Sequence, residues 1–153
     1  HFQHALETME LHTSLLGAAD VRTDLAWCYM LLGNYEQALE MCRLSEPVFI
    51  NFGDKRRLSV CYNHYGMIYA RMARYAEAER LLLHSIALAR ELNLLFDAAN
   101  ALESLGTVYC ERGEPDRALA VWEEGLQELE ALGEPPQRLY NLLRGKIQEV
   151  KAV

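Results

Sequence analysis

The feature that most constrains the fold of this chain is a pattern of residue types that recurs every 40 residues. In each copy a large apolar residue is followed by a small residue, an aromatic ring, a second small residue, a ring and a third small residue. The copies are Leu25, Ala26, Tyr29, Gly33, Tyr35 and Ala38; Tyr65, Gly66, Tyr69, Ala73, Tyr75 and Ala78; and Leu105, Gly106, Tyr109, Gly113, Pro115 and Ala118. Such a period predicts one small unit that is built several times and stacked, because a single unit cannot bury its own apolar face.

Each copy has the pattern of a helix, a tight turn and a second helix. Apolar residues recur at helical spacing over residues 19–32, Gly33-Asn34 interrupts them, and the spacing resumes over residues 35–51. The small residues would let the two helices of a unit approach closely, and the recurring tyrosines at 29, 69 and 109 would fill the space between them. Pro115 suits the first turn of a helix, where its fixed φ and missing N–H are tolerated.

The composition favours an all-α fold and excludes two classes of partner. The 153 residues are 51% hydrophobic, with only four prolines and nine glycines, and the abundant Ala and Leu favour helix over strand. The 22 acidic residues outnumber the 15 basic ones, for a net charge of −7, so we expect no direct nucleic-acid binding. No apolar stretch reaches the ~20 residues that span a bilayer, and no signal peptide is recognisable. We therefore expect a soluble chain that does not bind a membrane.

The four cysteines carry no spacing typical of a site. Cys28, Cys42, Cys61 and Cys110 stand singly, without the C-x-x-C arrangement of zinc and redox centres. We expect them to be small buried hydrophobic residues in a reducing compartment, which predicts a cytoplasmic protein.

No pattern indicates catalysis, and we predict that the chain is not an enzyme and holds no cofactor. It has no glycine-rich phosphate loop, no H-E-x-x-H and no G-x-S-x-G. His1, His4 and His12 would form a metal site with Glu7 if they shared one helix face. The alternative is an exposed, fraying terminal helix, and for that reason we predict no metal site.

The repeat resembles the tetratricopeptide repeat family, whose pattern is W-x2-L-G-x2-Y followed by A-x3-F. The matching segments are Arg22-x2-Leu25-Ala26-x2-Tyr29 with Ala38-x3-Cys42, Tyr62-x2-Tyr65-Gly66-x2-Tyr69 with Ala78-x3-Leu82, and Leu102-x2-Leu105-Gly106-x2-Tyr109 with Ala118-x3-Trp122. This resemblance implies an all-α, right-handed superhelical solenoid of antiparallel helix pairs.

The chain departs from the family in the length of its repeat. The family's unit is about 34 residues and usually closes with a proline, whereas Ile50, Arg90 and Glu130 stand in that column here. The longer unit resembles the arrays of MalT-like bacterial regulators, Rap-type peptide sensors, kinesin light chains and Pins/LGN adaptors.

We expect a single domain over residues 1–153, with three full repeats and a flanking helix at each end. Residues 1–17 would be the second helix of a truncated repeat, 19–52, 55–92 and 95–132 the full repeats, and 136–151 a closing helix. Pro47 would kink or end its helix early. Apolar residues near the first end, Phe2, Leu6, Met9 and Leu15, would pair with another copy or stay exposed. One expectation is thus a homo-oligomer formed through the exposed ends of the array.

A curved array presents the first helix of every unit on a concave groove. Helical spacing assigns to this groove the positions that packing does not use: Thr23, Trp27, Met30, Leu31, Asn63, His64, Met67, Arg71, Asn100, Glu103, Thr107 and Glu111. Trp27 is either a partner anchor or buried against the preceding helix, and Met30 and Met67 either line the groove or fill the core. Glu103 and Glu111 are either partner contacts or solvated charges.

The polar groove residues favour some partners over others. Asn63 and Arg71 would hydrogen-bond a peptide backbone or carboxylate, a use of Asn that the resemblance to long-repeat members implies. Chaperone-binding members clamp a C-terminal carboxylate with Lys, Asn and Arg, but the matching positions here hold Thr23, Trp27, His64, Asn100 and Ser104. We therefore predict a noncatalytic protein–protein interaction module that binds another peptide or protein partner. The alternative is a ligand- or peptide-sensing regulatory domain of a larger bacterial signalling or transcription-regulator protein.

Overall fold

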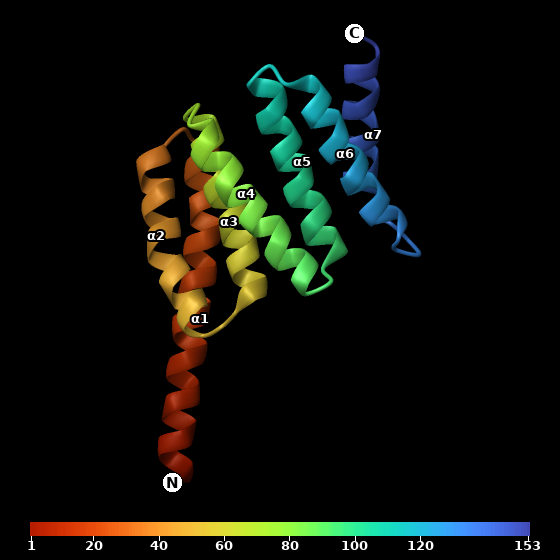
Figure 1. Ribbon diagram of the computed structural model, residues 1–153. Coiled ribbons are helices and arrows are strands. Elements are labelled where there is room, and N and C mark those ends of the chain that lie inside the picture. Colours follow the sequence, from red (N-terminus) through yellow and green to blue (C-terminus); the bar gives the residue numbers. More distant parts are fainter.

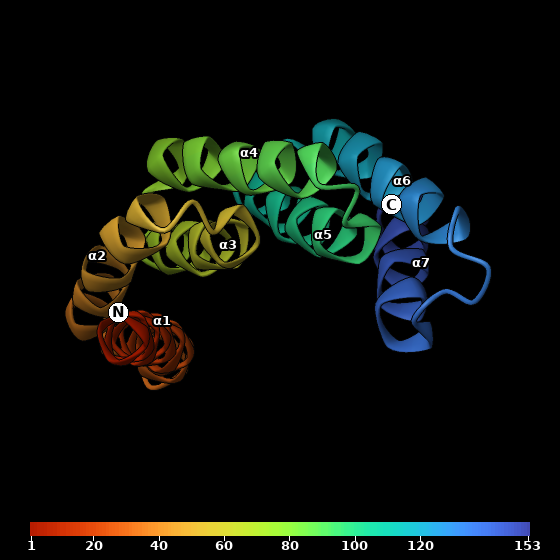
Figure 2. The same cartoon turned by 90° about the horizontal axis from the view of Figure 1, so that it is seen from below.

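The computed structural model describes all 153 residues, and it forms seven α-helices and no strand. The helices are α1 (Phe2–Leu31), α2 (Tyr35–Asn51), α3 (Lys55–Arg71), α4 (Tyr75–Glu91), α5 (Leu95–Glu111), α6 (Pro115–Glu130) and α7 (Gln137–Lys151). Consecutive helices run antiparallel and stack along one direction (Figure 1). Seen from below they form an arch, with α1, α3, α5 and α7 on its inner side and α2, α4 and α6 on its outer side (Figure 2). The predicted all-α solenoid is confirmed.

One residue in the left-handed backbone conformation ends each helix from α1 to α5. These residues are Gly33, Gly53, Ala73, Asn93 and Gly113, with φ between 55° and 80°. The amide of the next residue then donates to the carbonyl five positions back, as Asn34 does to Tyr29 at 2.9 Å, which satisfies carbonyls that the helix end leaves free. Because these turn residues are evenly spaced along the chain, α2 to α5 are all 17 residues long.

The expectation that residues 1–17 form a separate helix is wrong, because α1 continues without a break from Phe2 to Leu31. In the 40-residue register, Thr13 occupies the column of Gly53 and Asn93. A β-branched residue adopts the left-handed conformation only at high cost, and the Thr13 hydroxyl instead donates to the Met9 carbonyl within the helix. The N-terminal half of α1 therefore extends past α2 as a single rod (Figure 1).

Of the two outcomes predicted for Pro47, a kink or an early end of its helix, the early end does not occur. Pro47 lies inside α2, which continues to Asn51. A proline removes one backbone hydrogen bond, but the next turn carries Phe49, which is almost fully buried. Burial of this ring offsets the lost bond and keeps the last turn of α2 helical.

Small residues bring the two helices of a unit together. A Cβ added at Gly66 would lie 2.7 Å from Leu82 Cγ, and one added at Gly106 would overlap the Trp122 indole. Ala26, Ala38 and their counterparts at 78 and 118 are fully buried. The recurring small columns are therefore points of close helix contact, as their spacing predicts.

A second small column, which the sequence pattern did not single out, joins the same helices near their other ends. Ser45 donates to the Ala19 carbonyl at 3.0 Å, and Ser85 donates to the Ser59 carbonyl at 2.7 Å. Gly125 occupies the same column in the third unit. Buried hydroxyls at this crossing meet backbone carbonyls of the partner helix, so their polar atoms are satisfied.

The cysteines are not all buried. Cys42 and Cys61 are buried and Cys110 is half-buried, but Cys28 is exposed, so the expectation fails for Cys28. All four are free thiols. None of the seven helices combines the length and the apolar character needed to span a bilayer.

Replacing Gly106 with alanine tests the close contact of α5 with α6. We expect Gly106→Ala to lower the free energy of unfolding by about 1–3 kcal/mol, because the added methyl group displaces the buried Trp122 ring. The matched control is Gly17→Ala, where no atom lies within 4 Å of an added Cβ and alanine suits a helix better by ~0.5–1 kcal/mol. Urea unfolding measures both; equal stability of Gly106→Ala and wild type would contradict the packing argument.

Candidate partner-binding groove

The inner surface of the arch is the candidate site. It is formed by α1, α3, α5 and α7 (Figure 2), and α3 contacts both α1 and α5. Because the repeats keep one register, residues in the same column of successive repeats occupy equivalent places on successive helices. Trp27, Met67 and Thr107 are one such row.

Trp27 and His64 form an aromatic contact between α1 and α3. Their ring centroids are 5.0 Å apart, and Trp27 is 38% exposed. His64 Nδ1 lies 3.2 Å from the Thr23 carbonyl oxygen; since a carbonyl only accepts, Nδ1 carries a proton and donates. Burial lowers the pKa of His64, although this hydrogen bond and the charge of Asp24 oppose the shift. An uncharged imidazole therefore supports a tryptophan that is open to solvent.

Three residues expected in the groove, Met30, Thr23 and Asn63, are buried instead. Met30 is 3% exposed and belongs to the N-terminal core cluster with Ala26 and Ala38. The Thr23 side chain is also buried, and its hydroxyl donates to the Ala19 carbonyl of its own helix. For Met30 the packing alternative therefore holds, because its position faces α2 rather than the inner surface.

Asn63 is buried with an unused hydrogen-bonding group. Its side chain is 8% exposed and its Oδ1 has no hydrogen-bond partner. Together with His64, Asp97 and Asn100 it lines a cavity of about 30 Å³ between α3 and α5. A buried amide oxygen without a hydrogen-bond partner lowers the stability of the folded chain. Asn63 Oδ1 is thus an unused hydrogen-bond acceptor.

Closing helix α7 engages the groove residues of the third unit. Lys146 donates to the Glu103 carboxylate and, at 2.7 Å, to the Thr107 hydroxyl. Its ammonium lies 5.4 Å from the centre of the Trp122 ring, and Trp122 Nε1 donates to the Glu103 carbonyl at 3.0 Å. Glu103 and Thr107 thus hold α7 in place.

The remaining groove positions differ in exposure. Leu31, Arg71 and Glu111 form an exposed row at the ends of α1, α3 and α5, and none of the three side chains makes a hydrogen bond or ion pair. Met67 and Asn100 are half-buried. The exposed groove residues are therefore Trp27 and Leu31 on α1, Arg71 on α3 and Glu111 on α5.

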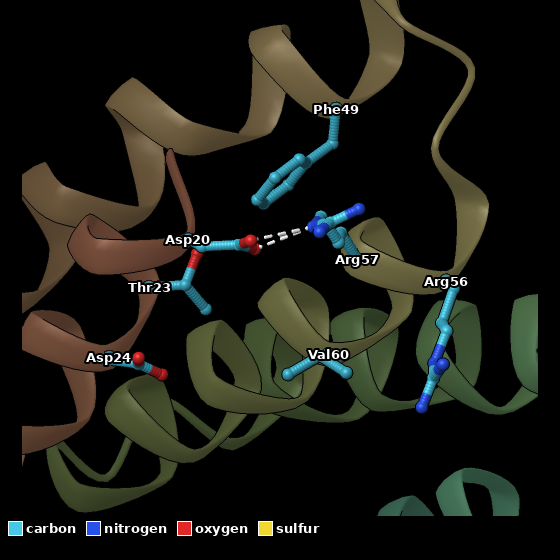
Figure 3. A pocket seen from close by; sticks show the side chains of 7 residues that line it. All are labelled: Asp20, Thr23, Asp24, Phe49, Arg56, Arg57 and Val60. Carbon is cyan, nitrogen blue, oxygen red and sulfur yellow. Dashed lines mark hydrogen bonds and ion pairs between the residues drawn. The ribbon is translucent and has the colours of Figure 1, made fainter. Parts of the chain in front are cut away.

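A pocket of about 360 Å³ opens between α1, α2 and α3 (Figure 3), lined by Asp20, Thr23, Asp24, Phe49, Arg56, Arg57 and Val60. Arg57 Nε donates to both carboxylate oxygens of Asp20, at 2.9 and 2.8 Å, and the same guanidinium bonds Asp54 at 2.6 Å. Arg56 lies 3.9 Å from Asp97. Asp24 is exposed and has neither a hydrogen bond nor an ion pair.

Helical spacing did not select the charged residues of this pocket, nor Lys146. The 40-residue register contained a signal for Asp20, Asp24 and the apolar Val60. Asp20 and Val60 precede Asn100 in its column, and Asp24 precedes His64. Extending each chosen column to all three repeats would have found them. Lys146 has no such signal, because the loop between α6 and α7 breaks the spacing.

No group of three His, Cys, Asp or Glu side chains converges on a position that suits a metal ion. His1 precedes α1, and His4 and Glu7 lie on its exposed N-terminal end. The His12 ring packs 4.9 Å from the Phe52 ring, which is a packing contact between α1 and the end of α2.

A search of curated proteins finds no match to this chain. The family model described as tetratricopeptide repeat matches residues 18–91 and 56–131, a span that includes α2 to α6 and the C-terminal part of α1 from residue 18 onward. The chain belongs to the tetratricopeptide repeat family. Tetratricopeptide repeats are in general noncatalytic protein–protein interaction modules.

Solved structures with the tetratricopeptide repeat fold resemble the chain at low sequence identity. BtubC (BKLC) from P. vanneervenii is 18% identical with a TM-score of 0.76, over 88% of this chain and 55% of that one. The N-terminal domain of stress-induced protein-1 from C. elegans is 17% identical, with a TM-score of 0.63 over 90% and 97%. A TPR-like protein from Chlorobium tepidum is 16% identical, with a TM-score of 0.68 over 92% and 98%. These likenesses establish the fold alone, and the chain spans about half the length of BtubC.

The half-buried imidazole of His64 predicts a specific loss of stability in mild acid. Because its pKa is lowered in the folded chain, the unfolded state, with a histidine pKa of about 6.5, binds more protons between the two pKa values. The free energy of unfolding therefore falls as the pH drops below about 6.5. We expect this loss, measured by urea unfolding between about pH 7.5 and 5.5, to be smaller in His64→Gln. His84→Gln, which changes an exposed histidine, should behave like wild type, and an equal loss in His64→Gln would refute the assignment.

Proposed function

We propose that this chain holds a peptide or protein partner along the inner surface of its arch and is not catalytic. The exposure of Trp27 carries the proposal. The ring lies on the inner surface and is 38% exposed, and the His64 ring packs against it at a centroid distance of 5.0 Å. Tryptophan is enriched among the residues that dominate binding energy at interfaces, and a ring already held in place loses little conformational entropy when a partner covers it.

Polar groups on α3 supply the hydrogen bonds that a peptide needs. The Asn63 amide has an unused oxygen, which is buried in the free chain, and Arg71 is exposed and unpaired. From Arg56 to Arg71 the inner face of α3 extends about 22 Å at ~1.5 Å per residue, which matches about seven residues of extended peptide. We propose that Asn63 bonds the partner's backbone and Arg71 a carboxylate.

The spacing of the helices supports the longer variety of the repeat. The outer helices begin at Tyr35, Tyr75 and Pro115, which share one column of the 40-residue register. We propose that the array is of the long-repeat type seen in MalT-like, Rap-type, kinesin light chain and Pins/LGN proteins.

A second candidate function is the sensing of a small ligand or peptide within a larger regulatory protein. The pocket between α1, α2 and α3 favours it, since about 360 Å³ lies in the range of ~300–1,000 Å³ typical of small-molecule sites. Only two of its seven lining residues are hydrophobic, whereas such sites are mostly apolar. The partner-binding proposal is therefore preferred.

We further propose that the extended end of α1 pairs with a second copy of the chain. Phe2, Ala5 and Met9 share the columns of Cys42, Ser45 and Phe49, which are all buried in α2. The same face on α1 is open to solvent, with Phe2 95% exposed. This face therefore carries the residue types of a helix–helix contact, and an exposed contact of this kind favours association.

Binding of a display-selected peptide tests the groove. We expect the wild-type chain to select peptides whose affinity falls at least about ten-fold in Trp27→Ala and several-fold in Arg71→Ala, as measured by fluorescence anisotropy. Arg80→Ala is the matched control, because Arg80 is an exposed, unpaired arginine on α4, a helix of the outer side of the arch. Selected peptides that bind all three variants as tightly as wild type would refute the groove assignment.

Sedimentation equilibrium tests the pairing of α1. We expect the wild-type chain to dimerise as its concentration rises and Met9→Glu to stay monomeric, because a charge would be buried in the helix contact. Gln3→Glu adds the same charge in the column of exposed Arg43 and Leu83 and should dimerise normally. A wild-type chain that is monomeric at every concentration would contradict the proposal.

A further inference from the structure

We infer that the pocket beside Asp24 receives a basic side chain of the partner, with arginine preferred over lysine. The inference rests on the proposed function, since it names the chemistry of one part of that groove. It is carried by the balance of charge in the pocket, by the position of Asp24 one helical turn from Trp27, and by a contact of similar chemistry between the third repeat and α7.

Of the four carboxylates in and around the pocket, only that of Asp24 has no ion pair. Arg57 is bonded to both Asp20 and Asp54, and Arg56 lies beside Asp97. The two guanidinium groups thus face three carboxylates before Asp24 is counted. With Asp24, which has no ion pair, four carboxylates face two guanidinium groups, so a cation reduces the excess negative charge, whereas an anion would add to it.

Asp24 stands where a cation would also meet an aromatic face. It lies one helical turn before Trp27 on the same side of α1, and its charge acts on His64, which contacts the Trp27 ring at 5.0 Å. A guanidinium bound to Asp24 would thus lie near the exposed indole and gain a cation–π contact. Arginine suits this position better than lysine, because its planar group both pairs with a carboxylate in two places and stacks on a ring.

The shape of the pocket fits the rest of such a side chain. Phe49 and Val60 form apolar walls against which the methylene stem of an arginine or lysine packs well. Figure 3 shows Asp24 and Arg56 on opposite sides of the pocket with Val60 between them. The cation at Asp24 is therefore separated from Arg56, whose charge is directed to Asp97.

The third repeat already contains a contact of this chemistry. Lys146 from α7 bonds the Glu103 carboxylate and lies 5.4 Å from the Trp122 ring centre. A carboxylate on the inner surface, an indole and a cation from a different helix are combined there. In the first repeat Asp24 and Trp27 provide the carboxylate and the indole, and the cation has to come from the partner.

Titration with a single amino-acid derivative tests the inference without a known partner. The probes are N-acetyl-arginine amide and its uncharged near-isostere N-acetyl-citrulline amide, added to the full chain up to about 50 mM so that millimolar binding saturates. Amide shifts of residues 20–24 and 56–60 in ¹H–¹⁵N NMR spectra report binding. We expect the arginine derivative to bind about five-fold more tightly than the citrulline derivative.

Variants at Asp24 locate the effect. We expect Asp24→Asn to reduce binding of the arginine derivative to the level of citrulline, Asp24→Glu to retain most of it, and Asp116→Asn, at an exposed unpaired aspartate of α6, to leave it unchanged. Equal binding of the two probes, no binding of either, or unchanged arginine binding in Asp24→Asn would each overturn the inference.

The two proposals fail separately. Display-selected peptides that need Trp27 while the arginine derivative does not bind would refute the basic subsite and leave the groove intact. Arginine binding that needs Asp24, without any peptide that needs Trp27, would support the subsite and refute the groove.

Discussion

The arrangement of this chain depends on one backbone conformation that recurs at even spacing from Gly33 to Gly113. A residue at positive φ ends each helix from α1 to α5 and reverses the chain, and the hydrogen bond that follows satisfies the free carbonyls of the helix end. Equal helix lengths follow from equal spacing of these turns. Equal lengths in turn place the small residues of one helix opposite the large residues of its neighbour, as Gly66 lies opposite Leu82.

Thr13 shows what happens when that residue is replaced. The position belongs to the turn column of Gly53 and Asn93, yet threonine favours the ordinary helical conformation there. The chain consequently forms one 30-residue helix instead of two short ones. A turn at residue 13 would have folded the N-terminal part of α1 back against the rest of that helix. Without the turn, the apolar face of this part is open to solvent.

Much of the fold follows from the sequence, because close helix contacts require small residues and tight turns favour Gly or Asn. The groove is less predictable. Trp27 and Met30 are only three positions apart, but one is open and the other buried, and helical spacing alone does not resolve so small an angular difference at the edge of an apolar stripe. The role of Lys146 depends on how α7 docks after a loop of different length, which the 40-residue period does not describe. The charges around Arg57 come from three segments, so their pairing required the packed structure.

The same geometry explains why equivalent positions on the inner surface can differ from repeat to repeat and so determine which partner binds. Columns at the helix contacts keep small residues, as at Ala26, Gly66 and Gly106, because a larger side chain would push the helices apart. The inner rows have no such limit: the row of Trp27 continues with Met67 and Thr107, and the row of Asp24 with His64 and Ser104. In the third unit α7 already occupies part of this surface through Lys146. The side chains open to a partner include the Trp27 ring and the unpaired Asp24 carboxylate on α1 and the unpaired Arg71 guanidinium on α3. A rigid surface that presents different chemistry at each row binds selectively, because a partner that mismatches one row leaves a polar group without its hydrogen bond.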